Sequence, residues 1–301
     1  LLLKFYLYKI QELETILYRL NLSNKVLEEV LDYIRNKFNF IDLAAIKAYD
    51  GEVPNFTICK HRPFTRLSIV CFKLIVLKQQ YKNKGIPESI FFDTIQDIRL
   101  RQELYYEENK KIGLSKDDVI WFRHLFNMHI FKLNILQFQL FNMVYLDEDS
   151  IGEEYMTFRE EQKDKLPPGS PVVNIHIQRN ADLNPVEVEK SLNIALDFFQ
   201  EYYPEHGPKA FVCYSWLLYS GNQKLLNKDS NIIKFAKRFE VISEVQDDKQ
   251  AIQNIYGKRF REKKDYPAST SLQQNALIYT KCLGMSCGVI YIYLLKKYTI
   301  A

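Results

Sequence analysis

Residues 173–203 read VNIHIQRNADLNPVEVEKSLNIALDFFQEYY, and this is the most informative stretch of the chain. Apolar and polar side chains alternate from residue 173 to residue 178, a period-two pattern typical of a strand with one buried face. Asn184-Pro185-Val186-Glu187 then supplies an N-cap, a proline at the first helical position and a returning carboxylate. Apolar residues continue at helical spacing as far as Tyr203. The stretch therefore predicts a strand followed directly by a long amphipathic helix.

Further alternation of strand and helix patterns follows this unit toward the C-terminus. Strands are predicted at residues 211–218, 240–245 and 288–294, and helices at residues 231–239 and 271–281. Together with the first strand and helix, the order is βαβαβ, a polar insertion, then αβ. This order predicts a mixed sheet flanked by helices.

The N-terminal part instead shows repeated helical spacing. Amphipathic helices are predicted over residues 23–38 and 65–82, the second stopping at Gly85-Ile86-Pro87, where a third begins. Ser115-Lys116-Asp117-Asp118 has the form of a capping box and opens another helix. Residues 1 to about 130 are therefore predicted to be predominantly helical.

The pattern changes again after residue 131, and the change bears on the domain organisation. Glutamines interrupt an apolar, aromatic run at residues 135–141 in the manner of a strand. A charged stretch and the turn-forming Pro167-Pro168-Gly169 follow, so we predict a boundary near residue 166. The expected fold is α+β: a mostly helical domain over residues 1–166, whose last strand at about 133–145 joins the sheet, and a second domain over residues 167–301.

Composition excludes several classes of protein. Hydrophobic residues make up 47% and charged residues 26% of the 301, which excludes disorder of the whole chain. The net charge of +4 is small and evenly divided, so no nucleic-acid partner is expected. The apolar start is too short to span a bilayer, so we expect no membrane partner and a cytoplasmic location. The five cysteines lack metal-ligand or disulfide spacing, which predicts buried thiols and no metal site.

Specific short motifs, taken in order, resemble the GNAT-like acyltransferases, a family with an N-terminal acyltransferase-associated helical domain and a GNAT-like C-terminal domain. The N-terminal matches are Arg62-Pro63-Phe64-Thr65-Arg66-Leu67, Gly85-Ile86-Pro87 with Asp93-Thr94-Ile95-Gln96-Asp97-Ile98, and Phe131-Lys132-Leu133-Asn134-Ile135-Leu136-Gln137-Phe138. The C-terminal matches are Asn174-Ile175-His176-Ile177, Ser191, Ser215-Trp216-Leu217-Leu218, Ser230-Asn231-Ile232 with Phe235 and Arg238-Phe239, and Thr270-Ser271-Leu272-Gln273.

The resemblance implies transfer of an acyl group from acetyl-CoA or another acyl-CoA to an amine of a small molecule or peptide. It places the pyrophosphate of the donor at a loop before a helix, here Gln178, Arg179 and Asn180 and the residues up to Asn184. Such loops are usually rich in glycine, and this one contains none. Arg179 would attract a pyrophosphate and Asp182 would repel it.

Four further side chains are candidates for chemistry, and three of them have a structural alternative. His176 lies on the polar side of its strand, where a neutral imidazole could act as a base or simply form a structural hydrogen bond. The resemblance places Ser215, as a catalytic candidate, and Trp216 where two strands splay to admit the pantetheine arm, although Trp216 also suits a core. Asn231 could contact substrate, but N-capping explains it equally well.

The leading hypothesis is thus an acyl-CoA-dependent N-acyltransferase, in which the helical region helps to form the acceptor pocket. The alternative is a non-catalytic GNAT-like ligand-binding or regulatory protein that lacks the phosphate loop. The sequence leaves open the acceptor, the acyl chain length, the tyrosine that would act as general acid and the oligomeric state.

Overall fold

The chain folds into two compact units, Leu1–Phe131 (unit 1) and Lys132–Ala301 (unit 2). The computed structural model describes residues 2–179, 181–257, 266–293 and 295. The predicted boundary near residue 166 falls inside unit 2. Residues 136–142 form a strand that pairs with residues 171–176, so hydrogen bonding ties the segment before residue 166 to the sheet.

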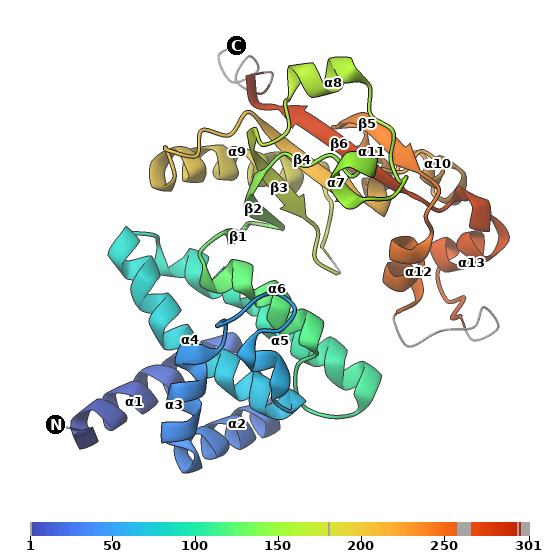
Figure 1. The fold of residues 1–301 in the computed structure, drawn as a ribbon. Coiled ribbons are helices and arrows are strands. Elements are labelled where there is room, and N and C mark those ends of the chain that lie inside the picture. Colours follow the sequence, from blue (N-terminus) through green and yellow to red (C-terminus); the bar gives the residue numbers. More distant parts are fainter. Residues whose placement is uncertain (1, 180, 258–265, 294, 296–301) are drawn as a thin grey trace. The chain divides into compact units, whose positions relative to one another are not determined.

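Unit 1 is helical, as the sequence predicts. Its elements are α1 (Leu2–Leu20), α2 (Asn24–Asn36), α3 (Phe38–Lys47), the 3-10 helix η1 (Thr57–Lys60), α4 (Pro63–Lys84), α5 (Glu88–Asn109) and α6 (Lys116–Phe126). Helix α4 is central, because it packs against α1, α2, α3, α5 and α6 (Figure 1). Its fully buried side chains include Leu67, Val70, Leu74 and Leu77.

The helix ends of unit 1 follow local signals in the sequence. Ser23 caps α2 by accepting a hydrogen bond from the amide of Val26 at 3.4 Å. Helix α4 ends at Gly85, whose φ of 75° is left-handed and costs glycine nothing. The capping box at α6 forms as predicted, with Ser115 Oγ accepting from the amide of Asp118 at 3.0 Å. At each of these three helix ends, the residues that fix the end lie within one helical turn of it.

Unit 2 is built around a six-stranded sheet in the order β1-β2-β3-β4-β6-β5. The strands are β1 (Ile130–Leu133), β2 (Leu136–Asn142), β3 (Pro171–His176), β4 (Ala210–Ser215), β5 (Glu240–Val245) and β6 (Met285–Tyr291). The helices are α7 (Glu148–Ile151), α8 (Glu160–Lys165), α9 (Pro185–Tyr202), α10 (Asn222–Leu225), α11 (Asn231–Ala236), α12 (Lys249–Tyr256), α13 (Ser271–Ile278), and the 3-10 helices η2 (Trp216–Leu218) and η4 (Thr280–Cys282).

Strands β3 and β4 are parallel, and the pairs β2–β3, β4–β6 and β5–β6 are antiparallel. Helix α9 is the crossover between the two parallel strands, which are drawn together near the middle of the sheet in Figure 1. Phe138 of β2 and Phe211 of β4 pack against each other with ring centroids 5.7 Å apart. The α+β class and the mixed sheet with flanking helices are thus confirmed.

Two strand predictions differ in extent from the structure. The strand expected over residues 211–218 ends at Ser215, and Trp216–Leu218 forms η2 instead. The side chain of Ser215 accepts a hydrogen bond from the amide of Leu217, which favours a turn over continued extension. The last strand begins at Met285, before the predicted residue 288, and Leu294 lies outside the described residues.

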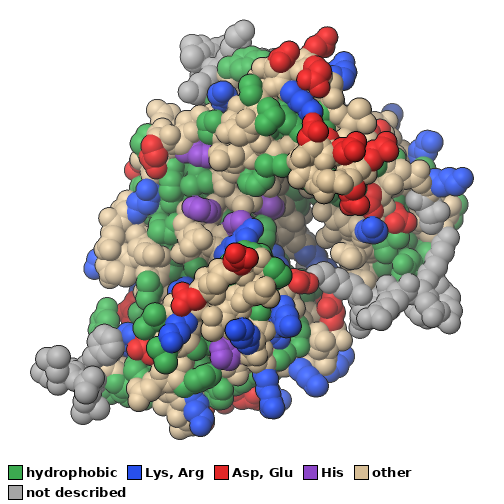
Figure 2. All heavy atoms as spheres, in the orientation of Figure 1, with side chains coloured by type: hydrophobic (Ala, Val, Ile, Leu, Met, Phe, Trp, Pro, Cys, Tyr) green, Lys and Arg blue, Asp and Glu red, His purple; other side chains and the backbone are tan. Residues whose placement is uncertain are grey.

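The surface and the cysteines carry little specialisation. On the face that Figure 2 shows, acidic and basic side chains are interspersed. Across the described ranges, no helix is both long and apolar enough to cross a bilayer, and no cluster of three or more histidine, cysteine or acidic side chains could hold a metal ion. Four of the five free cysteines are buried.

Candidate active site

The ladder between the two parallel strands stops before the strands do. Strands β3 and β4 pair at Val173 with Phe211 and at Asn174 with Val212. Strand β3 nevertheless continues to His176 and β4 to Ser215. The carboxyl ends of the two strands therefore diverge, and diverging edges of this kind can pair with an extended ligand. This divergence lies where the resemblance places the pantetheine arm.

The register also assigns each side chain to one face of the sheet, because directly opposed residues share a face and successive residues alternate. Asn174 lies opposite Gln139 of β2 and opposite Val212 of β4. His176, two residues after Asn174, and Tyr214, two residues after Val212, therefore share this face. Ser215 belongs to the other face, so the two predicted catalytic side chains do not lie on the same side of the sheet.

His176 is half-buried at the end of β3 and is held by a neighbouring amide. Its Nε2 lies 2.7 Å from Oε1 of Gln139, a side chain that is only 5% exposed. With the amide oxygen as acceptor, Nε2 carries the hydrogen and Nδ1 carries the lone pair. This tautomer gives the imidazole a nitrogen that can accept a proton.

The polar face continues past the strand end. Oε1 of Gln178 accepts a hydrogen bond from Nζ of Lys132, and the same ammonium donates to the carbonyl of Ile135 at 3.1 Å. Lys132 thus brings a positive charge to the segment that follows His176. Arg179 is exposed, and Asn180 lies outside the described residues.

Tyr214 faces the same side as His176 and is engaged with the backbone. Its hydroxyl donates to the carbonyl of Val144. Burial raises the pKa of Tyr214, and it likewise raises the pKa of the neighbouring Cys287 thiol to about 12. Both groups therefore stay protonated near neutral pH, and a Cys287 thiol that is protonated is a poor nucleophile.

Ser215 and Trp216 form the turn at the end of β4. Ser215 is 6% exposed, and its Oγ accepts from the amide of Leu217 at 3.1 Å. Trp216 is 8% exposed, and its carbonyl accepts from Nδ2 of Asn222 at 2.7 Å. Ser286 lies opposite Ser215 on β6. Oγ of Ser286 and Oδ1 of Asn222 are buried and have no hydrogen-bond partner within the described part of the chain.

Neighbouring residues already accept hydrogen bonds from some of the backbone N–H groups at the N-terminus of α9. Oδ1 of Asn184 accepts from the amide of Val186 at 2.9 Å, and Pro185 has no N–H to offer. Oδ1 of Asp182 accepts from the amide of Asn184 at 3.1 Å and from Nδ2 of Asn231 at 3.2 Å. A carboxylate therefore lies where an anion would approach the helix.

Asn231 does not cap α11, which corrects the N-capping interpretation. Ser230 is the cap, with Oγ accepting from the amide of Ile233 at 3.3 Å, and Asn231 is the first helical residue. Its amide instead links α11 to the loop before α9 through Asp182. Ser230 and Asn231 are adjacent in the sequence, and the backbone geometry makes Ser230 the cap.

The structure thus groups the candidates into three places: His176 and Gln178 on the polar face, Ser215 and Trp216 at the turn, and Asn231 beside Asp182. The sequence analysis did not identify Gln139 as the partner of His176 or Lys132 as the partner of Gln178. A signal was present for Gln139, because a glutamine in an apolar strand needs a polar neighbour once buried.

An apolar hollow of about 200 Å³ lies elsewhere in unit 2. Its lining includes Phe199 and Tyr203 from the C-terminal end of α9, Phe211 from the start of β4, and Ile292. It contains none of the predicted site residues, so it is separate from the diverging strand ends.

Each of the two units matches a family model of known proteins. The model of the GNAT-like C-terminal domain matches residues 130–289, and that of the N-acyltransferase N-terminal domain matches residues 11–128. A search of curated proteins found no match.

Solved structures share the fold over nearly the whole chain. A crystal structure of an acyltransferase in complex with decanoyl-CoA and teicoplanin is 16% identical, with a TM-score of 0.71 over 92% of this chain and 87% of that chain. A mutant acyltransferase in complex with octanoyl-CoA is 16% identical, with a TM-score of 0.70 over 93% and 88%. An acyltransferase in complex with decanoyl-CoA is 18% identical, with a TM-score of 0.70 over 92% and 86%. With its two domain matches and a mixed sheet whose central parallel strands diverge, this chain belongs to the family of proteins that carry a GNAT-like C-terminal domain behind an N-acyltransferase N-terminal domain.

Proposed function

We propose that this protein transfers an acyl group from an acyl-coenzyme A to an amine. The observation that carries the proposal is the early end of the β3–β4 ladder at Asn174 and Val212. An extended thioester arm needs backbone donors and acceptors along its length, and the diverging edges supply them. Membership of the GNAT-like family and the fold shared with acyltransferases crystallised with acyl-CoAs support it.

In the proposed reaction the amine nitrogen attacks the thioester carbonyl, the new C–N bond forms, and the C–S bond breaks. The attacking amine loses a proton, which Nδ1 of His176 accepts, and the departing thiolate gains one. Gln139 holds the imidazole in the tautomer that leaves Nδ1 as the acceptor. No covalent enzyme intermediate is required, so most of the rate increase comes from positioning the two reactants.

Ser215 and Trp216 enter the proposal through the shape of the strand end. The hydrogen bond from the amide of Leu217 to Ser215 Oγ fixes the turn into η2, and Trp216 follows directly. Ser215 is thus a positioning residue, because its side chain lies on the face opposite His176. Trp216 would border the donor or the acceptor at this end of β4.

The donor phosphates are proposed to lie against the loop from Gln178 to Asn184. Arg179 is exposed at the start of this loop and provides the attraction. The acceptor is proposed to be an amine on a small molecule, which is supported by the teicoplanin bound to an acyltransferase of the same fold.

A non-catalytic, ligand-binding role is the second candidate, and one observation favours it. At the N-terminus of α9, Pro185 lacks an N–H, Asn184 occupies the amide of Val186, and Asp182 adds a negative charge. Each feature weakens the anion site that GNAT-like enzymes build there. A protein with this helix end could bind a ligand between β3 and β4 without acyl transfer.

One set of titrations separates the two candidates. Binding of coenzyme A, acetyl-CoA, octanoyl-CoA and decanoyl-CoA is measured by isothermal titration calorimetry, and thiol release is followed with a panel of amines. Micromolar affinity with amine-dependent release of coenzyme A supports the enzyme. Binding without release under every acceptor supports the second candidate, and no binding at millimolar ligand overturns both.

A further inference from the structure

Arg66 is a buried cation in unit 1 that forms no ion pair with any residue that the structure describes. It lies in the first turns of α4, within the Arg62–Leu67 motif, and is 6% exposed. Nε and Nη1 of its guanidinium are buried, and neither donates a hydrogen bond to any residue that the structure describes. A guanidinium stays charged at all physiological pH values. Buried charges in proteins are paired or hydrogen-bonded, because leaving one unpaired is strongly destabilising.

Asp118, the acidic side chain within electrostatic reach of Arg66, is engaged elsewhere. Oδ1 of Asp118 accepts from Nη1 of Arg101 at 3.1 Å, and Oδ2 accepts from the amide and the hydroxyl of Ser115 at 2.9 and 2.6 Å. Asp97 accepts from Nε of Arg101 at 3.0 Å and from Nε1 of Trp121 at 2.9 Å. The carboxylates around α6 thus pair with Arg101 and cap the helix. None of the ion pairs among the described residues includes Arg66.

The groups within electrostatic reach of Arg66 are Asp118 of α6, Cys59 of η1, Tyr105 of α5 and His61. Cys59 of η1 is 6% exposed, Tyr105 of α5 is half-buried, and His61 follows η1. All three lie close enough to Arg66 for electrostatic interaction. Burial, and then Arg66, lower the pKa of His61, so this imidazole is neutral at pH 7. Asp118 is the charged group among these four, and both of its oxygens already accept hydrogen bonds from Arg101 and Ser115.

We propose that Arg66 is the base of a small anion site in unit 1, which takes one carboxylate or phosphate group. The planar guanidinium presents parallel donors that match two oxygens of such a group. The hydroxyl of Tyr105 and the imidazole of His61 are half-buried and are further donors within electrostatic reach of Arg66. Since every residue of this site lies in unit 1, the inference is independent of the acyl transfer proposed for the diverging strands of unit 2.

The test uses the full chain and two probes, inorganic phosphate and acetate, each titrated at constant ionic strength while the thermal unfolding midpoint is recorded. Wild type is expected to be stabilised by at least one of the two anions. Arg66→Met, which keeps the length and volume of the side chain, is expected to raise the midpoint concentration of that anion at least tenfold. Response to phosphate alone assigns a phosphate group, and response to acetate assigns a carboxylate.

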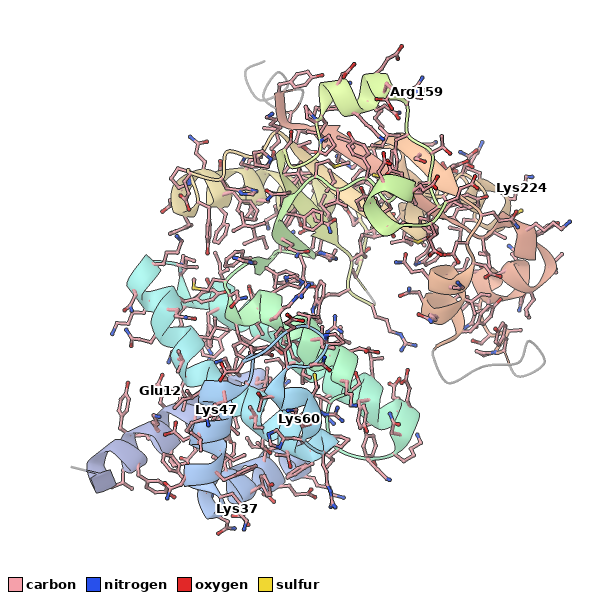
Figure 3. The ribbon with its side chains drawn as sticks, viewed as in Figure 1. Glu12, Lys37, Lys47, Lys60, Arg159 and Lys224 are labelled. Atoms are coloured by element: carbon pink, nitrogen blue, oxygen red, sulfur yellow. The ribbon has the colours of Figure 1, made fainter. Side chains whose placement is uncertain are left out.

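Lys60→Met is the matched control, because Lys60 is an exposed cation beside Cys59 and its loss removes the same charge from the surface (Figure 3). It should keep the wild-type response. If Arg66→Met does not fold, Arg66→Lys keeps the charge but loses the fork, and it should show the same tenfold weakening. The proposal is overturned if wild type responds to neither anion, or if the Arg66 variant that folds retains the wild-type midpoint.

Discussion

Asp182→Asn is expected to tighten the binding of coenzyme A. Asp182 is exposed and accepts from the amide of Asn184 at 3.1 Å, so its charge lies at the N-terminus of α9. A phosphate charge bound at this helix end about 5 Å away would be repelled by about 0.8 kcal/mol in a water-like dielectric. Removing that repulsion should lower the Kd of coenzyme A about fourfold for each phosphate charge at this spacing.

Asparagine keeps the oxygen that accepts from Asn184 and Asn231, so the loop should retain its shape. Thermal stability should change by no more than about 0.5 kcal/mol. Arg179→Ala makes the opposite change in charge and should weaken coenzyme A at least about tenfold, because a charge-assisted contact is worth about 1.5 to 3 kcal/mol.

Asp197→Asn is the control, since it is the same substitution at an exposed position of the same helix. It lies 12 residues beyond Pro185, about 18 Å along the axis at 1.5 Å per residue, and the Debye length is about 8 Å at physiological salt. Calorimetric titration should therefore show tighter binding for Asp182→Asn only, and the difference should shrink in 1 M salt. Equal affinity of wild type and both variants would refute a phosphate site at this loop.

Four further outcomes are expected. His176→Gln should lower kcat about 100-fold or more, measured by steady-state kinetics, and should leave the fold intact. Ser215→Ala should instead lower stability by about 1 to 3 kcal/mol in urea unfolding, because the amide of Leu217 loses its acceptor. Gly288→Ala should destabilise by about 1 to 3 kcal/mol in urea unfolding, because its Cβ would lie 2.6 Å from Cδ1 of Leu218 and 2.9 Å from Cβ of Phe239. Burial, Arg123 and His129 lower the pKa of His124 to about 4, below the value of about 6.5 in an unfolded chain. The unfolded state therefore binds a proton first, stability should fall as pH drops from about 6.5 to 4, and His124→Asn should flatten that part of the profile.

Patterns that act within one or two turns were predictable from the chain alone. Ser115 and Asp118, three residues apart, predict the capping box. Gly85 predicts the end of α4, because only glycine adopts a left-handed φ without strain. The alternation at residues 173–178 and the cap at Asn184 likewise predict β3 and α9 closely. In each case the interacting groups are neighbours in sequence, so the energy that fixes the element is local.

Partners that come from distant segments required the three-dimensional structure. Backbone angles decide that Ser230, and not Asn231, caps α11. Asn231 instead donates a hydrogen bond to Asp182, which lies 49 residues earlier in the chain. The assignment of His176 and Ser215 to opposite faces depends on the register of three strands, since a shift of one residue exchanges the faces. The charge of Arg66 is visible in the sequence, but its burial, with the nearby Asp118 already paired with Arg101, follows only from how the helices of unit 1 pack.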